Sequence, residues 1–257
     1  MSARRSRSFS RRRLLNAVSI ATLLVAWYAI TKAQLIHPFL LSSPSEVVQE
    51  AWDLARTGVI FRFAGVSLLR VLEGFLLGVV LAVPLGVLIG RVEMLHDLFD
   101  PILELARPIP ALALIPLAIA WFGIGELSKV FLIGYAAFFP ILINVIAGFH
   151  AVDPVHVRAA RSLRASELQI FRDVMLMSAF PHIVAGLRIG MGMAFLVLVA
   201  AELIASNAGL GYLIQEARLN FHTPRIFVGI IAIGLLGYAL SKTLLELERR
   251  IVPWKSL

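Results

Sequence analysis

The sequence predicts an all-α membrane protein that crosses the bilayer six times. Hydrophobic residues fill 59% of its 257 positions and charged residues 16%, whereas a soluble domain is about 45–50% apolar and about 25% charged. The apolar residues gather into uncharged runs, and a bilayer core needs about 20 mostly apolar helical residues to span it. These observations argue against a water-soluble enzyme domain and against a disordered chain. The absence of cysteine excludes a disulfide scaffold and a thiolate zinc site.

Six apolar runs define the expected spans. The first, Leu14 to Thr31, is flanked by Arg13 and Lys32, and the fifth is the weakest because it carries Arg188 and Glu202 near its ends. In the second, Arg70 and Glu73 are i,i+3 neighbours that can pair on one helix face. The spans are expected at about 14–34, 65–90, 107–125, 129–149, 183–205 and 226–245.

Basic residues place both termini on the cytoplasmic side. Lysine and arginine favour cytoplasmic loops, and one set of connecting segments holds 15 of them against six in the other set. Six of the 15 lie within residues 1–13, so this arm carries much of the assignment. It also accounts for much of the net charge of +8, and no nucleic-acid partner is expected. The two sets are 1–13, 91–107, 151–182 and 246–257 on the inside, and 32–62, 126–129 and 205–225 on the outside.

The basic arm has rival interpretations. The segment Ser10 to Leu15 resembles a twin-arginine export signal, and a cleavable signal peptide also places basic residues before an apolar run. The uncharged run has 18 residues, which exceeds the 7–15 of a signal peptide, and its one cleavage-like site, at Lys32, is poor. We therefore expect 1–13 to be a cytoplasmic arm and 14–257 to form one transmembrane domain.

No enzyme signature is present. The chain has no phosphate-binding loop of the G-x-x-x-x-G-K-[ST] type, no H-E-x-x-H and no G-x-S-x-G. Its six histidines are scattered without metal-ligand spacing. We expect no catalytic, cofactor-binding or metal site.

One helix start on the outside segments has a clear cap. Ser43 to Glu46 forms a capping box with Pro44 at the first helical position, and it opens a helix too short and too charged to span. This helix is expected along the membrane interface or packed on neighbouring spans.

The longest expected inside loop, 151–181, is the most informative segment. Asp153 with Pro154 and then Ser166 with Gln169 mark the starts of two short amphipathic helices, 154–163 and 167–175. Such helices either insert into a groove of a soluble partner or pack beneath their own bundle. The spacing alone does not decide between these two.

Several segments together resemble a known family. They are Arg158 to Ser166, Arg107 to Pro110, Trp121 to Gly125 with Ser128-Lys129, Ala201 to Ile204, Gly209 to Tyr212 and Glu248 to Trp254. These segments are similar to those of the permeases of binding-protein-dependent ABC importers, in the nitrate, sulfonate and taurine branch. The resemblance covers roughly residues 40 to 254. The resemblance implies the fold of a type I ABC importer permease with both termini cytoplasmic.

The resemblance also implies a function and partners. Loop 151–181 would dock on a separate ATPase, which would hold the ATP and magnesium, so that no cofactor is bound by this chain. The partners would be a second permease copy in a homodimer, two ATPase subunits and an external binding protein, in the inner membrane of a bacterium. The solute would be a small anion (aliphatic sulfonate, taurine or nitrate) moved by alternating access. The implied coupling residues are Arg158, Ala159, Ala160, Arg161, Leu163, Arg164, Ala165, Ser166, Phe171 and Arg172.

The loop departs from the family pattern at three positions. Arg158 replaces the glutamate of the family's Glu-Ala-Ala triplet, Arg164 replaces a glycine, and Met177 stands near an expected proline. The family's glycine supplies a left-handed backbone at the hinge between the two helices, and a residue with a side chain in that conformation costs about 1–2 kcal/mol. The alternative is that Arg164 forms a turn at negative φ. We expect the strained form, because helix-end carbonyls favour a nearby cation.

Three polar residues in the spans are candidates for the translocation pathway or its gate. Glu202, near the exterior end of the fifth span, either has a structural role, in which it holds the exterior gate or pairs with a base, or lies in the pathway. Asn144 hydrogen-bonds either a neighbouring helix or a solute, and Arg188 is expected to anchor the inner end of its span. The alternative function is a stand-alone, proton-coupled secondary transporter that uses Glu202.

Overall fold

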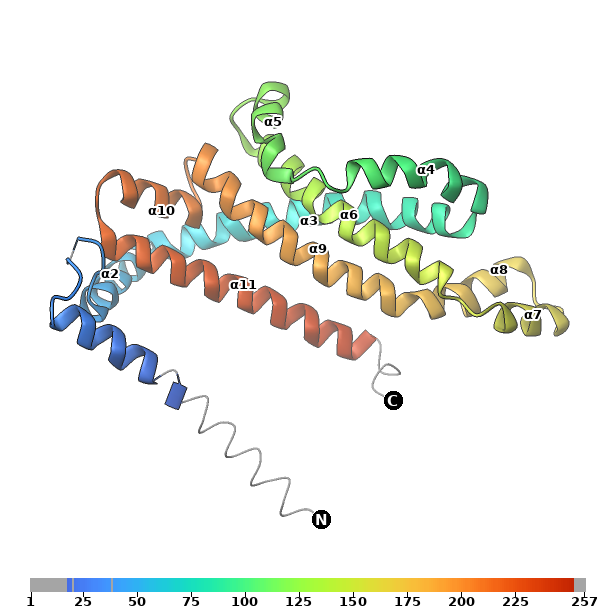
Figure 1. Cartoon of the computed structure of the whole chain (residues 1–257), viewed down its shortest axis with the longest axis horizontal. Helices are drawn as coiled ribbons and strands as arrows, with labels where there is room; N and C mark the ends of the chain where they lie inside the picture. The colour runs from blue at the N-terminus through green and yellow to red at the C-terminus, as the bar shows by residue number, and fades with distance from the viewer. Residues whose placement is uncertain (1–17, 20, 38, 252–257) are drawn as a thin grey trace, which may run out of the picture. The chain divides into compact units, whose positions relative to one another are not determined.

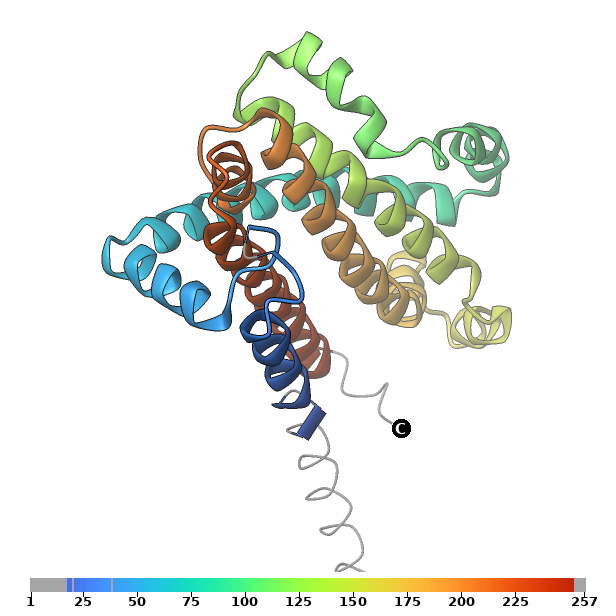
Figure 2. The same cartoon turned by 60° about the vertical axis from the view of Figure 1, so that its left-hand side comes forward.

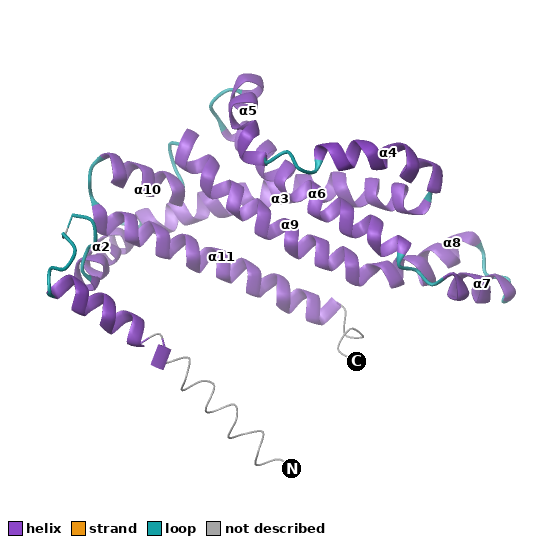
Figure 3. Cartoon of the chain, viewed as in Figure 1, coloured by secondary structure: helices purple, strands orange, loops and turns teal. Residues whose placement is uncertain are grey.

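A computed structural model describes residues 18–19, 21–37 and 39–251, and all regular structure within them is helical (Figures 1 and 3). This confirms the all-α class. After a first helix at 21–32, the elements are α2 (Pro44–Arg56), α3 (Val59–Arg91), α4 (Glu93–Ala106), the 3-10 turn η1 (Ala111–Leu114), α5 (Ile115–Phe122), α6 (Glu126–His150), α7 (Pro154–Ser162), α8 (Glu167–Gln169), the π-helical η2 (Ile170–Met175), α9 (Leu176–Ala205), α10 (Leu210–Leu219) and α11 (Thr223–Ile251).

Within the described residues, four helical stretches are long and apolar enough to cross a membrane, and a bent pair makes up to five. The four contain α3, α6, α9 and α11, which agree with the spans expected at 65–90, 129–149, 183–205 and 226–245. The first expected span, 14–34, includes positions 14–17 and 20, which lie outside the described residues. The total of six spans therefore stays a prediction.

The span expected at 107–125 is not one continuous helix. The chain around it consists of α4, a break at 107–110, and then η1 with α5, and the two helical parts are bent by 79°. Pro108 and Pro110 explain the break, because proline lacks the amide hydrogen that an inner helical turn needs and disfavours helical geometry in the residue before it.

The larger of two compact units comprises residues 62–212 and 232–257, and α6 is the core of that unit. Its side chains Ile133, Ile141 and Val145 are fully buried. Glycines let the helices on either side approach it: a Cβ added to Gly74 of α3 would lie 2.5 Å from the Ile133 side chain, and one added to Gly190 of α9 would lie 2.7 Å from that of Ile141. Figure 2 shows α6 running alongside α9.

The smaller unit comprises residues up to 61 together with 213–231. Within it, the rings of Trp27 and Phe227 lie 5.6 Å apart, and Arg225 Nε bonds Glu50 Oε1 at 2.7 Å. The capping box expected at the start of α2 is present: the Ser43 hydroxyl accepts from the Glu46 amide, and Glu46 Oε2 accepts from the Ser43 amide. The position of α2 at a membrane interface stays a prediction.

Candidate functional site

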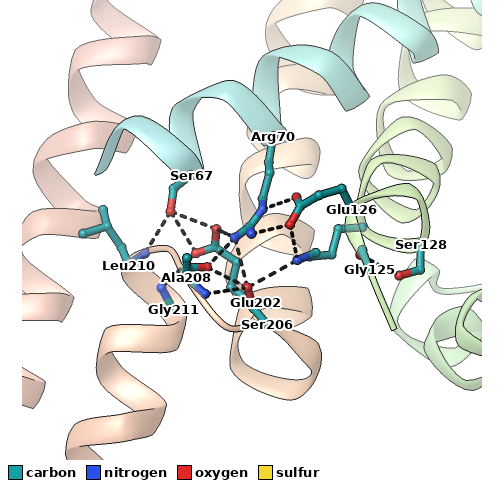
Figure 4. Close-up of polar contacts among 11 residues, drawn as sticks. Ser67, Arg70, Gly125, Glu126, Ser128, Glu202, Ser206, Ala208, Leu210 and Gly211 are labelled. Atoms are coloured by element: carbon teal, nitrogen blue, oxygen red, sulfur yellow. Dashed lines mark hydrogen bonds and ion pairs between the residues drawn. The ribbon is translucent and has the colours of Figure 1, made fainter. Parts of the chain in front are cut away.

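Charged side chains from distant segments meet at one end of α6 and α9 (Figure 4). Ser67 and Arg70 come from α3, Glu126 and Lys129 from the start of α6, and Glu202 from the last turns of α9. Ser206 and the backbone of residues 208–211 complete the set. We call these residues the charge cluster.

Arg70 is the centre of the charge cluster. Its Nε and Nη2 donate to the two carboxylate oxygens of Glu126 at 2.5 and 2.6 Å, and its Nη1 donates to Glu202 Oε1 at 2.8 Å. Nη1 also donates to the Ser206 hydroxyl at 3.0 Å and to the Ala208 carbonyl. The side chain is only 5% exposed. The fork geometry of a guanidinium suits it to bridging two carboxylates in this way.

Glu202 is a buried carboxylate with several donors. It is 1% exposed, and besides Arg70 it accepts from the Ser67 hydroxyl and from the Gly211 amide, each at 2.9 Å. Gly211 lies in the first turn of α10, where the helix dipole favours a negative charge. Of the roles considered for Glu202, the structure shows pairing with a base, Arg70. The local pair of Arg70 with Glu73 is absent from the described contacts, and Glu73 is exposed, because Arg70 turns to partners on other helices.

The charge cluster is balanced. Lys129, whose side chain is 4% exposed, places Nζ 2.9 Å from Glu126 Oε1, so two cations face two carboxylates. Only Glu126 reaches solvent substantially, with 59% of its side chain exposed. Burying unpaired charges is costly, whereas buried pairs with full hydrogen bonding are tolerated. We infer that the arrangement holds α3, α6 and α9 together.

Two glycines after α9 make room for the buried carboxylate. Gly209 has φ +114°, and a Cβ there would lie 2.2 Å from Glu202 Oε1. A Cβ on Gly211 would lie 2.6 Å from the Glu202 Cβ. Sequence reasoning missed Ser67, Glu126 and Lys129 as partners. The available signal was the concentration of charges near the ends of apolar runs beside a Gly-Leu-Gly segment.

At the other end of α9, residues 154–175 form α7, a turn at 163–166, α8 and η2. The cap expected at Asp153 is present, with its Oδ1 accepting from the Val155 amide at 2.8 Å. Arg164 has φ +59°, as we expected. The Arg164 amide donates to Arg161 O and the Ala165 amide to Ala160 O, which is the Schellman pattern that usually places glycine at the Arg164 position.

The second expected loop helix is not separate from the span that follows. Its capping box at Ser166 and Gln169 is present, but α8 runs through the π-helical η2 directly into α9. Met177, at the position near which the family pattern has a proline, allows the helix to continue. Ile170 is buried here, and Phe171 stacks on Phe149 with ring centroids 6.1 Å apart.

The rest of the loop is largely exposed. Leu163 and Leu168 are 83% and 73% exposed, although both are large apolar side chains. Of the implied coupling residues, Ala160, Ala165 and Phe171 are half-buried, and the exposed ones are Arg158, Ala159, Arg161, Leu163, Arg164, Ser166 and Arg172. In this loop η2 packs on its own bundle, while the turn presents apolar and basic side chains outward; insertion into a partner stays a prediction.

The three pathway candidates do not form one site. Glu202 belongs to the charge cluster. Asn144 lies in the C-terminal third of α6, where its Nδ2 donates to Pro140 O at 2.8 Å, and it lines a cavity. Arg188 pairs with Glu248 of α11, with Nη1 3.2 Å from Oε2.

Comparison with known proteins identifies the family. Residues 74–253 match the family described as the binding-protein-dependent transport system inner membrane component. The chain belongs to this family. It is 38% identical over 250 residues to the taurine transport system permease protein TauC of Escherichia coli (strain K12), covering 95% of this chain and 91% of the relative. It is 35% identical over 236 residues to the putative aliphatic sulfonates transport permease protein SsuC of Bacillus subtilis (strain 168), covering 92% and 86%.

Solved structures support the same fold. The permease matches a chain of the MetNI methionine ABC transporter in an inward-facing conformation with a TM-score of 0.57 and 19% identity, covering 72% of this chain and 96% of that one. It is therefore a multi-pass membrane permease with the fold of ABC importer permeases, and a transport protein rather than an enzyme. Membership in a binding-protein-dependent family implies an ATPase and a binding protein as partners.

Proposed function

We propose that this permease is the transmembrane subunit of an ATP-driven importer for a small anion of the sulfonate, taurine or nitrate type. The relatives support the substrate class: besides those for taurine and aliphatic sulfonates, the nitrate import permease protein NrtB of Synechocystis is 33% identical over 246 residues, covering 92% of this chain and 88% of the relative. An external binding protein delivers the anion, and the permease sits as a homodimer in the bacterial inner membrane. The solute passes by alternating access.

Loop 151–181 is the proposed contact with the ATPase. The carrying observation is the exposure of Leu163 and Leu168 beside exposed arginines, next to η2, which packs on the bundle through Ile170 and Phe171. An exposed apolar side chain at the tip of a polar turn suits a groove on a partner protein. ATP and magnesium belong to that partner, and η2, packed through Ile170 and Phe171, passes its movement to α9.

The alternative of a proton-coupled transporter is not favoured. The family is binding-protein-dependent, and the Glu202 carboxylate is bound by Arg70, Ser67 and the Gly211 amide. A buried carboxylate bound in this way acts as the structural counter-charge of Arg70.

Charge reversal in the loop tests the coupling. Arg161→Glu and Arg172→Glu are expected to leave the unfolding free energy of the permease within about 1 kcal/mol of wild type, because each side chain takes part only in an exposed pair, with Glu167 and Asp173 respectively. Co-purification of the ATPase and solute-stimulated ATP hydrolysis are expected to fall at least about tenfold, since a like charge opposing a docked partner costs more than 1.4 kcal/mol.

The matched control is Arg249→Glu, an exposed arginine at the end of α11, which is expected to behave as wild type. Normal ATPase binding and stimulation in both loop variants would remove the assignment of the loop at these residues.

A further inference from the structure

A cavity of 540 Å³ opens beside the break between α4 and η1. Its walls come from residues 107–112, from α6 and from α9, all within the larger compact unit. Its volume lies within the range of about 300–1,000 Å³ found for small-molecule sites. The charge cluster contributes none of its described lining residues.

The cavity lies level with the middle of the membrane helices. On α6 its lining extends from Tyr135 to Asn144, a rise of roughly 13.5 Å that straddles the centre of that helix. The irregular backbone at 107–110 forms another wall. Non-helical backbone at membrane depth is stable only where protein or a water-filled cavity surrounds it. The cavity therefore accounts for the stability of the irregular backbone at the proline-rich break.

Arg107 gives this cavity its charge. It is the one charged residue among the described residues that line the cavity, and within residues 18–19, 21–37 and 39–251 no carboxylate forms an ion pair with it. Arg70 and Lys129 are buried and compensated by carboxylates, whereas Arg107 is exposed in the single chain, so its guanidinium is accessible to an anion that enters the cavity. A cation at membrane depth without a protein counter-charge marks a place where an anion is favoured.

The other walls are mostly apolar. Phe139, Ile143 and Met193 line the cavity. Asn144 uses one amide hydrogen on Pro140 O, which leaves its second amide hydrogen and its oxygen available. A guanidinium, one amide and apolar walls suit an organic anion with an alkyl part better than an inorganic anion.

We propose that this cavity holds an alkylsulfonate in transit, with the sulfonate at Arg107 and the alkyl chain against Phe139, Ile143 and Met193. The proposal rests on the proposed import function and narrows its substrate class. Nitrate has the headgroup contact but no chain to place against the apolar wall, so it is transported less well.

The test uses the complete importer, reconstituted in proteoliposomes with its ATPase and binding protein and supplied with radiolabelled ethanesulfonate. Arg107→Gln is expected to lower uptake at least about tenfold, the loss of a charged hydrogen-bond partner, while ATP hydrolysis stimulated by the loaded binding protein stays within twofold of wild type. Arg107→Lys is expected to recover part of the uptake because it restores the charge without the fork. Arg249→Gln, an exposed arginine, is the control and is expected to transport as wild type.

A second variant separates a solute contact from a structural role. Phe139→Ala removes a ring from the apolar wall and enlarges the cavity, so the ratio of hexanesulfonate to ethanesulfonate uptake is expected to rise at least about fivefold, in line with the modest discrimination that apolar pockets give per methylene. A residue that only supports the fold would lower both rates and leave the ratio unchanged. This ratio also decides the matter if Arg107→Gln fails to assemble.

The possible failures are distinguishable. If the wild-type importer takes up none of ethanesulfonate, taurine and nitrate, the proposed function is wrong. If it takes up sulfonates but Arg107→Gln matches wild type, or the chain-length ratio is unchanged in Phe139→Ala, the cavity is not the solute site. Faster uptake of nitrate than of ethanesulfonate by the wild type would likewise overturn the proposal.

Discussion

The two ends of α9 are built in opposite ways. At its C-terminal end, Glu202 is buried and held by donors from α3 and α10. At its N-terminal end, the turn after α7 carries charges on the surface, where Arg161 and Glu167 form an exposed pair with Nε 3.2 Å from Oε1. The first end fixes helices to one another, whereas the second leaves side chains free for a partner.

The energetic consequence is that charges should matter for stability at one end and for coupling at the other. Removing one partner of a buried pair costs about 3–5 kcal/mol because the remaining charge is left without compensation. An exposed pair contributes about 0–1 kcal/mol. Substitutions at the two ends therefore test whether stability and coupling are separately encoded.

The largest effect is expected for Arg70→Met. It leaves Glu202 buried without a cation, so the permease in lipid nanodiscs should lose about 3–5 kcal/mol of unfolding free energy, measured by denaturant or thermal unfolding. Glu73→Gln, an exposed position on the same helix, is the control and should stay within about 0.5 kcal/mol of wild type.

A double variant sharpens this prediction. Arg70→Met with Glu202→Leu removes both charges of the buried pair, and replacing such a pair by apolar residues often leaves the unfolding free energy unchanged. The double variant should therefore be more stable than Arg70→Met alone. Equal or greater instability would mean that the charge cluster is held mainly by packing.

A smaller effect is expected for Glu202→Gln. The amide oxygen still accepts from Gly211, and Arg70 keeps Glu126, so the loss of unfolding free energy should be about 1–3 kcal/mol. Uptake into vesicles should be largely retained, should require ATP and should show no proton dependence. Uptake driven by a pH gradient alone in the wild type, and lost in this variant, would contradict the importer assignment.

The fold was predictable where the signal was local. Apolar run length located four membrane helices, and the caps at Ser43, Asp153 and Ser166 located three helix starts. The break at 107–110 was visible in its prolines but was outweighed by the length of the apolar run.

The partners in the charge cluster were not predictable in the same way. Pairing with a base was one of the roles considered for Glu202, but its partner Arg70 lies 132 positions away, and no local pattern joins them. The expected Arg70–Glu73 pair follows a rule worth only about 0.2–0.5 kcal/mol, which is too little to compete with a buried carboxylate. Long-range pairing depends on how the helices pack, and one sequence does not specify that.

The smallest effect is expected for Arg164→Gly, at the turn between α7 and α8. Arginine at φ +59° carries a cost of about 1–2 kcal/mol that glycine avoids, while glycine adds about 0.5–1 kcal/mol of backbone entropy to the unfolded chain. The variant should therefore be as stable as wild type or about 1 kcal/mol more stable, with altered stimulation of the ATPase.

Arg164→Ala separates backbone strain from charge at this position. Alanine keeps the strain and removes the guanidinium, so its stability should be no greater than that of wild type. If the guanidinium contacts the ATPase, the glycine and alanine variants should lose stimulation of ATP hydrolysis to a similar extent, because both lack it. If backbone geometry matters instead, only the glycine variant should change, because it alone frees the turn to adopt other φ values. A loss of several kcal/mol in Arg164→Gly would contradict the strain argument, since the Schellman hydrogen bonds of Arg164 and Ala165 are made by backbone groups and do not need the side chain.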